Sequence, residues 1–124
     1  MQIIKKFPEE LTAADVYNLC MSPAAERMKE HVDEVIELSK YALYRDDNRE
    51  AAEVGADDEA TSTEVLSIMS AYGEIFATNS LTFIRDFFRM IDLFTSMGEQ
   101  VQAIRIIKGT SKKGREFITC TLDH

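Results

Sequence analysis

The sequence predicts a fold that is mostly β with α: an OB-fold-like barrel of five strands, with a helix between the third and fourth strands. Two observations predict it. β-rich runs come before and after one strongly amphipathic helix, and glycine-containing turns separate neighbouring runs in each half. A small split α+β sheet would have the same element order and remains the alternative. The length of 124 residues fits a single domain with a modest core.

Short helices are expected in the N-terminal segment 1–33. Thr12–Asp15 resembles a capping box with Asp in place of Glu, so it would begin a helix. Ser22–Pro23 is typical of another helix start, with the helix continuing over Ala24–Glu30. Because these helices carry few apolar residues, we expect a helical appendage on an OB-like core formed by residues 34–124.

The first three strands of the predicted barrel lie between Val35 and Asn79. Val35–Tyr44 is rich in β-forming residues, although its alternation is imperfect and a helix is the competing interpretation. Glu64–Ser70 and Glu74–Asn79 flank Ala71-Tyr72-Gly73, a strong hairpin signal. The segment 46–63, between the first strand and this hairpin, is expected to be a long acidic loop.

The clearest helix follows the third strand. Ser80 can cap its start, and Gly98 can end it in the left-handed conformation. Apolar residues recur at three- and four-residue spacing at Ile84, Phe87, Phe88, Ile91 and Phe94, with Arg85, Arg89, Asp92 and Ser96 on the opposite side. The aromatic stripe is interpreted as core rather than as a ligand pocket, because the amphipathic period alone explains it.

The last two strands lie in Val101–Leu122 and are joined by the basic segment Gly109–Arg115. That segment has the Gly-x4-Gly spacing of a phosphate loop, but a strand follows it instead of Lys-Ser/Thr and a helix. Two interpretations therefore remain, a solvated hairpin turn and a turn that contacts a nucleic-acid backbone. Composition alone favours the solvated turn.

The negative charge of the chain is concentrated in one window. Eight acidic residues and Arg49 lie between Asp46 and Glu64, so this window carries −7 of the net charge of −8. The remaining residues are close to neutral. Because salt screens charges beyond about 8–10 Å, a local basic stripe can still bind phosphate.

Catalytic and metal-binding constellations are missing from the sequence. His31 and His124 are the only histidines, and Cys20 and Cys120 lie in unrelated contexts. We therefore expect no enzyme activity, no cofactor and no metal. The absence of a long apolar run and of a signal-peptide pattern predicts a cytoplasmic protein that does not bind membranes.

Aromatic residues on or beside the predicted strands suggest single-stranded nucleic acid, which proteins hold by base stacking together with cations. They are Tyr41, Tyr44, Tyr72, Phe76 and Phe117. Each could equally fill the core. Phe117 is distinctive because it alternates away from the apolar face of its strand.

From Thr63 onward, about half of the chain resembles the small single-stranded-DNA-binding proteins of protein-primed Bacillus phages and their relatives in mobile elements of Gram-positive bacteria. Three motifs carry the resemblance. Gly73–Ser80 is similar to the family's hairpin strand, and Ile91–Leu93 recurs in its helix. Ile106–Phe117 is close to the family's aliphatic pair followed by Gly-Thr-Ser-x-Lys-Gly-x-x-Phe. Residues 1–33 have no counterpart in these motifs.

The resemblance implies a non-enzymatic protein that coats single-stranded DNA during phage or mobile-element replication, with replication proteins as further partners. By this resemblance Phe76 takes the family's strand aromatic, and Tyr44-Arg45 matches an aromatic–basic pair. Together with the basic hairpin, the candidate nucleic-acid-binding residues are Tyr41, Tyr44, Arg45, Phe76, Arg105, Lys108, Lys112, Lys113, Arg115 and Phe117. The alternative function is an acidic protein-interaction or inhibitory module, whose loop 46–63 would bind a basic partner.

Overall fold

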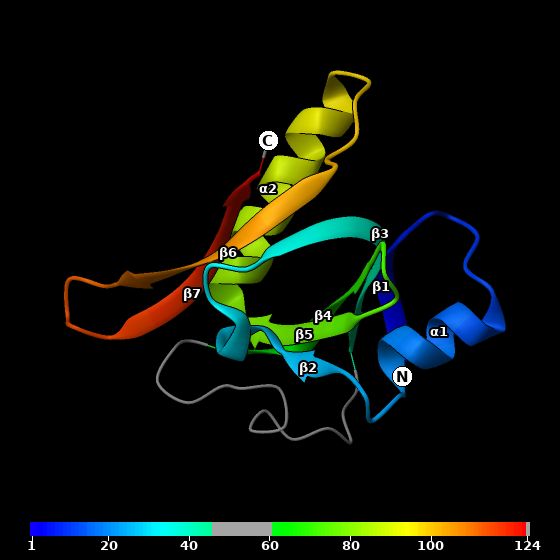
Figure 1. The fold of residues 1–124 in the computed structure, drawn as a ribbon, viewed down its shortest axis with the longest axis horizontal. Coiled ribbons are helices and arrows are strands. Elements are labelled where there is room, and N and C mark those ends of the chain that lie inside the picture. Colours follow the sequence, from blue (N-terminus) through cyan, green and yellow to red (C-terminus); the bar gives the residue numbers. More distant parts are fainter. Residues whose placement is uncertain (46–60, 124) are drawn as a thin grey trace.

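The computed structural model describes residues 1–45 and 61–123. Its main feature is a curled sheet, with α2 on one face and α1 on the other (Figure 1). The elements are β1 (Gln2–Phe7), α1 (Ala13–Cys20), β2 (Glu26–Arg27), the 3-10 turn η1 (Met28–His31), β3 (Val35–Arg45), β4 (Thr61–Ser70), β5 (Ile75–Ser80), α2 (Leu81–Ser96), β6 (Ala103–Thr110) and β7 (Glu116–Leu122).

The five predicted strands and the helix between the third and fourth are confirmed as β3, β4, β5, α2, β6 and β7. In the described residues the strand order is β2-β5-β4-β3-β6-β7, and β1 also pairs with β3. The first residues of β3 pair with β6, whereas its second half pairs with β1 on one side and β4 on the other. The result is a half-barrel, mostly β with α and consistent with the OB-like prediction.

The open side of the half-barrel lies between β5 and β7. No ladder joins these two strands in the part of the chain that the structure describes, and β2 pairs in parallel with β5 at Phe76 and Ala77. The side chain of Ser80 reaches across this gap, where its hydroxyl donates to the Ile118 carbonyl at 3.4 Å. Helix α2 begins directly after Ser80 and packs against β7.

Both faces of the sheet are covered. Successive residues of β3 point to opposite sides, so each face has its own apolar cluster. Tyr41 and Leu43 join the larger apolar cluster, which includes the buried residues of α2. Ala42 and Tyr44 join a second cluster with Leu19 and other residues of α1. The N-terminal segment therefore shields one face of the half-barrel from solvent.

The structure corrects two predictions for the N-terminal segment. Residues 2–7, expected within a helical appendage, form β1, because the free edge of β3 satisfies their backbone hydrogen bonds. The helix expected over Ala24–Glu30 is wrong: β2 and η1 occupy this segment, and the fully buried Met28 packs in the larger cluster. The capping box at Thr12 is confirmed, with Asp15 supplying the reciprocal bond.

The predicted ends and buried face of α2 are confirmed. The Ser80 hydroxyl accepts a hydrogen bond from the Phe83 amide, and Gly98 has a φ of 72°. Phe83 and Phe87 are fully buried, because they lie at the centre of the apolar stripe.

The described residues contain neither a membrane-spanning helix nor a candidate metal site, and they leave out most of the acidic segment. None of their helices is long and apolar enough to cross a membrane. They hold no group of three or more His, Cys, Asp or Glu side chains that could bind a metal. The proposed partner-binding role of the acidic segment 46–63 falls mainly on residues 46–60, which lie outside the described ranges.

Candidate nucleic-acid interface

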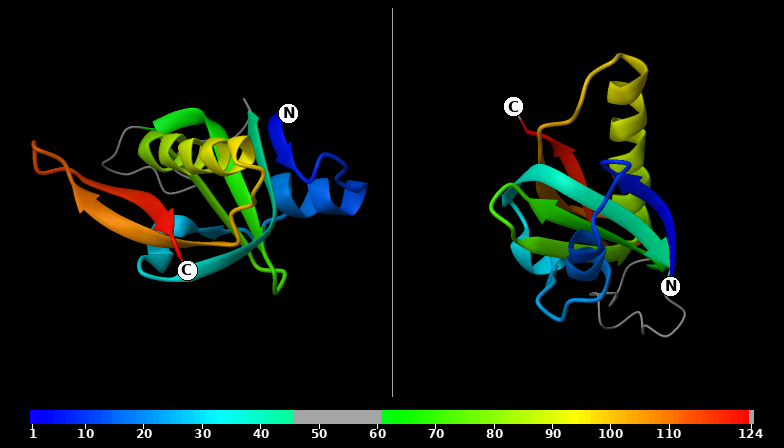
Figure 2. Two further views of the ribbon diagram at one scale, coloured as in Figure 1. Left: turned by 90° about the horizontal axis from the view of Figure 1, so that it is seen from above. Right: turned by 90° about the vertical axis from the view of Figure 1, so that its right-hand side faces the viewer.

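The basic turn lies at the tip of the β6–β7 hairpin, which projects from the body of the molecule (Figure 2). The turn is held by its own hydrogen bonds: the Ser111 amide donates to the Arg115 carbonyl at 2.8 Å, and the Ser111 hydroxyl accepts from the Arg115 amide at 3.1 Å. Lys112, Lys113 and Arg115 are exposed and form no ion pair with any described residue. A fixed backbone thus presents three cations that are free to meet anions.

Two other predicted cations of the hairpin are already paired. Lys108 lies 2.9 Å from the Glu116 carboxylate on the neighbouring strand. Arg105 donates to the Asp33 carbonyl at 2.8 Å and pairs with Asp123 at 3.3 Å. Because exposed ion pairs are weak, Lys108 can exchange Glu116 for phosphate, whereas Arg105 joins β6 to the segment before β3.

Phe117 lies opposite Gly109 in the β6–β7 ladder. A Cβ atom at position 109 would come within 2.5 Å of the ring, so only glycine lets the ring lie across the neighbouring strand. The ring is partly exposed and is on the same face of β7 as Thr119. Phe117 is therefore the predicted stacking residue that combines solvent access with proximity to the basic turn.

The other three predicted aromatics are core residues. Tyr44 is fully buried, while Phe76 is 4% and Tyr41 is 7% exposed. Tyr44 lies beneath α1. The ring centres of Phe76 and His31 are 5.0 Å apart. Tyr41 packs against Phe7 and two phenylalanines of α2. All three are buried because both faces of the sheet are covered, so in this structure none offers a ring face to a base. Their stacking role stays a prediction.

Arg45 completes the predicted set at the end of β3. Its guanidinium lies 3.5 Å from the Glu64 carboxylate on β4, and its side chain is about half exposed. It is remote in the fold from the basic turn, which lies at the tip of a different hairpin. The structure thus brings together Lys108, the three turn cations and Phe117, and leaves Arg45 outside this group.

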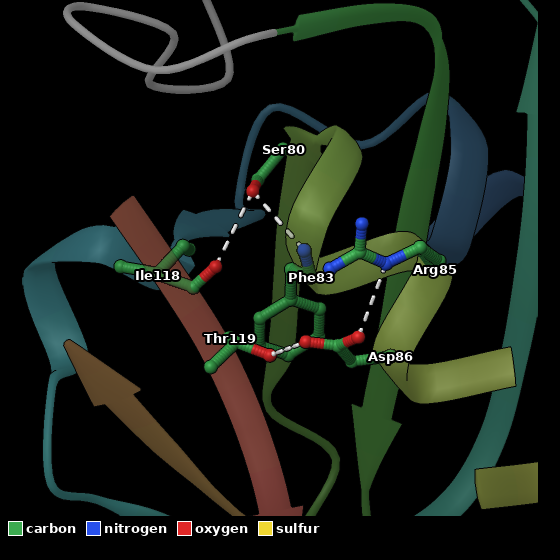
Figure 3. Close-up of polar contacts among 6 residues, drawn as sticks. All are labelled: Ser80, Phe83, Arg85, Asp86, Ile118 and Thr119. Carbon is green, nitrogen blue, oxygen red and sulfur yellow. Dashed lines mark hydrogen bonds and ion pairs between the residues drawn. The ribbon is translucent and has the colours of Figure 1, made fainter. Parts of the chain in front are cut away.

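A polar bridge joins the hairpin to α2 (Figure 3). The Thr119 hydroxyl donates to the Asp86 carboxylate at 2.5 Å, and the other oxygen of Asp86 lies 3.3 Å from Nε of Arg85. The Arg85 side chain is 65% exposed. The sequence placed Arg85 on the outer side of the helix, but no sequence signal indicated that its neighbour Asp86 would join it to β7.

On another side of α2, the Nζ atom of Lys5 lies 4.5 Å from the centre of the Phe88 ring. Lys5 belongs to β1, a strand that the sequence did not predict. This cation–π contact places a further positive charge against the helix.

The buried cysteines give the molecule no reactive nucleophile at this surface. Burial, with a smaller effect of the nearby Asp86 carboxylate, raises the pKa of the Cys120 thiol to about 12. Cys20 is also buried, in the cluster beneath α1. A thiol with so high a pKa stays protonated at neutral pH, so Cys120 acts as an apolar core residue.

Comparison with known proteins shows the family to which this chain belongs. The family model described as phage single-stranded DNA-binding protein, of the phi29 type, matches residues 10–123. The match starts well before Thr63, so it includes α1, β2 and η1, which the sequence motifs had left unassigned. No curated protein and no solved structure gave a significant match. Because the family model covers nearly the whole chain, the protein belongs to the phage single-stranded DNA-binding protein family, and single-stranded DNA is its partner.

Proposed function

We propose that this protein is a non-enzymatic coat for single-stranded DNA during the replication of a phage or mobile element, and that it grips the strand with the β6–β7 hairpin. The observation that carries the proposal is the basic turn: Lys112, Lys113 and Arg115 have no ion-pair partner among the described residues. They project from the body of an otherwise acidic chain. Contacts of this kind bind the backbone without reading sequence.

Phe117 supplies the second part of the proposed mechanism. Its ring lies in the ladder immediately after the turn, supported from below by Gly109. Stacking of one base on an aromatic ring contributes roughly 1–3 kcal/mol to the binding free energy, and any of the bases can stack in this way. Turn cations and one ring together therefore support affinity without strong sequence preference, as a strand-coating protein requires.

Two groups near the hairpin support the non-enzymatic part of the proposal. Near the hairpin, the thiol of Cys120 is buried and protonated, and the carboxylate of Asp86 is occupied by Thr119 and Arg85. Neither group is poised as a nucleophile or a general base.

Titration with oligo-dT at several salt concentrations tests the proposal. In a turn variant, Lys112→Gln/Lys113→Gln, we expect weaker binding and a fall of about 1.4 in the log–log salt slope, because each phosphate contact on a single strand contributes about 0.7. A control variant, Lys6→Gln/Arg27→Gln, removes the same charge from the α1 side of the sheet. Lys6 pairs with Ala42 and Arg27 with Ala77, and both alanines face α1.

The control variant should keep the wild-type slope. If the wild-type protein fails to bind oligo-dT at low salt, the proposed function is wrong. If the control variant loses binding and the turn variant does not, the strand uses the α1 side, and the proposed role of the hairpin is wrong.

Phe117→Trp provides a direct readout of stacking, because the chain contains no tryptophan. We expect quenching of this single indole on addition of oligo-dT. The matched control is Tyr72→Trp, which places the indole at an exposed residue of the β4–β5 turn. Unchanged fluorescence of the Phe117→Trp variant at saturating oligo-dT would exclude stacking at this position.

A further inference from the structure

We propose that the binding track for single-stranded DNA continues from the basic turn across the outer side of α2, where Arg85 and Arg89 contact successive phosphates and Lys5 lies at the far edge. This inference rests on the proposed function. It assigns a second set of contacts to the same strand, on an element outside the β6–β7 hairpin.

A series of polar contacts from β7 to Arg85 supports the start of the track on α2. Asp86 accepts from the Thr119 hydroxyl and holds Nε of Arg85, as Figure 3 shows. The terminal nitrogens of Arg85 form no bond with any described residue and remain available on a side chain that is 65% exposed. A guanidinium that is oriented by one carboxylate can still offer its outer edge to phosphate.

The helix geometry carries the second step. Arg89 follows Arg85 by one turn, so the two side chains lie on the same ridge of α2. Arg89 is exposed and has no ion-pair partner in the described ranges. The ridge lies between two flanks: Asp86 contacts β7 on one side, and Phe88 contacts Lys5 of β1 on the other.

Continuity with the basic turn carries the third step. Phe117 and Thr119 are on one face of β7, so the face that bears the stacking ring also reaches α2. Figure 2 shows α2 lying between the β6–β7 hairpin and β1. A strand leaving the turn therefore passes the Phe117 ring before it meets Arg85.

The charges along this path favour a polyanion. In order, the cations are those of the turn, Arg85, Arg89 and Lys5, and Asp86, which pairs with Arg85, offsets one of these charges. Asp92 follows Arg89 on the exposed side of α2, so the cationic part of the ridge ends at Arg89. An OB fold covers about 4–16 nucleotides, so a site of this class can include contacts beyond the turn.

Binding of oligo-dT of two lengths tests the extended track. The helix variant is Arg85→Gln/Arg89→Gln, which keeps good helix formers at exposed positions. For an oligomer of about 16 nucleotides we expect the salt slope to fall by about 1.4. For one of about 4 nucleotides, which the turn and Phe117 can occupy by themselves, we expect little change.

Three comparisons make the result decisive. The variant Arg85→Lys/Arg89→Lys keeps both charges and should bind the long oligomer nearly as well as the wild type. The control variant Lys6→Gln/Arg27→Gln should leave binding of both oligomers unchanged. Circular dichroism and thermal melts of every variant establish that each is folded.

Failure of the inference and failure of the proposed function give different results. If the turn variant weakens binding and the helix variant binds the long oligomer like the wild type, the track across α2 is wrong and the function stands. An equal loss for both oligomers also overturns the track, because Arg85 and Arg89 would then belong to the primary contact. If the wild-type protein binds neither oligomer, the proposed function itself fails.

Discussion

The ring of Phe117 lies across the backbone of Gly109 on the adjacent strand, at a position where a Cβ atom would approach the ring to 2.5 Å. Gly109 has no side chain that could cover its own backbone. The ring of Phe117 covers that backbone instead. The pair fixes the ring beside the basic turn, so one local contact joins the proposed stacking residue to the proposed phosphate contacts.

Gly109→Ala should turn the Phe117 ring away from the ladder. We expect a loss of about 0.2–1 kcal/mol in the free energy of unfolding, the range of one cross-strand pair. We also expect weaker oligo-dT binding. Urea unfolding measures the loss of stability. In a double-mutant cycle with Phe117→Leu, the Gly109→Ala substitution should lower the free energy of unfolding less in the Phe117→Leu background than in the wild type. An equal cost in both backgrounds would show that the ring does not set the requirement for glycine.

Ser80→Ala should destabilise the protein because one hydroxyl serves two elements. It accepts from the Phe83 amide at 3.2 Å and donates to the Ile118 carbonyl at 3.4 Å, and it is fully buried. Loss of the helix cap alone costs about 0.5–2 kcal/mol. Ser96→Ala, an exposed site in the last turn of α2, is the control and should change stability by less than about 0.5 kcal/mol. Equal effects of the two substitutions in urea unfolding would contradict the assigned bridge between β5 and β7.

The native protein should resist thiol reagents at pH 8. The pKa of Cys120 is raised to about 12, chiefly by burial, and Cys20 is also buried. We expect labelling by a disulfide reagent to be slow in buffer and complete in denaturant, because only unfolded chains expose the thiolates. Single Cys→Ala variants assign the rates. Rapid labelling of Cys120 in the native state would mean that β7 opens away from α2.

The stability contributed by Asp15 should disappear in acid. The hydrogen bond from Lys40, at 2.8 Å, and the bond from the Thr12 amide lower the pKa of the Asp15 carboxyl below its ordinary value of 3.8. The folded state therefore favours the carboxylate, so this contribution is complete above pH 3.8 and falls as the pH drops through the lowered pKa.

Unfolding of the wild type and of Asp15→Asn across this pH range measures the effect. Asparagine keeps the capping function but not the charge, so the wild type should lose its advantage over the variant as the pH falls. A difference that stays constant down to the lowest pH would show that the carboxylate of Asp15 is not favoured by folding.

The elements from β3 to β7 were predictable because their signals are local. Ser80 and Gly98 mark the ends of α2, and the Tyr72-Gly73 turn marks the β4–β5 hairpin. The N-terminal elements could not be predicted in this way, since β1 depends on the free edge of β3 and Met28 is buried in a cluster of residues distant in the sequence. Long-range packing of this kind leaves no periodic pattern in a short segment.

The sequence by itself determined the order of the elements from β3 to β7, including the amphipathic helix. It also determined the cations of the turn between Gly109 and Arg115 and the family motifs, because composition and spacing encode them directly. Only the tertiary structure decided which of the candidate residues are buried and which are accessible. It buried Tyr41, Tyr44 and Phe76, left Phe117 accessible, and joined Asp86, the neighbour of Arg85, to β7. The physical reason is that an aromatic residue on a strand has the same local signature whether its face is covered or open, and coverage depends on where distant helices pack.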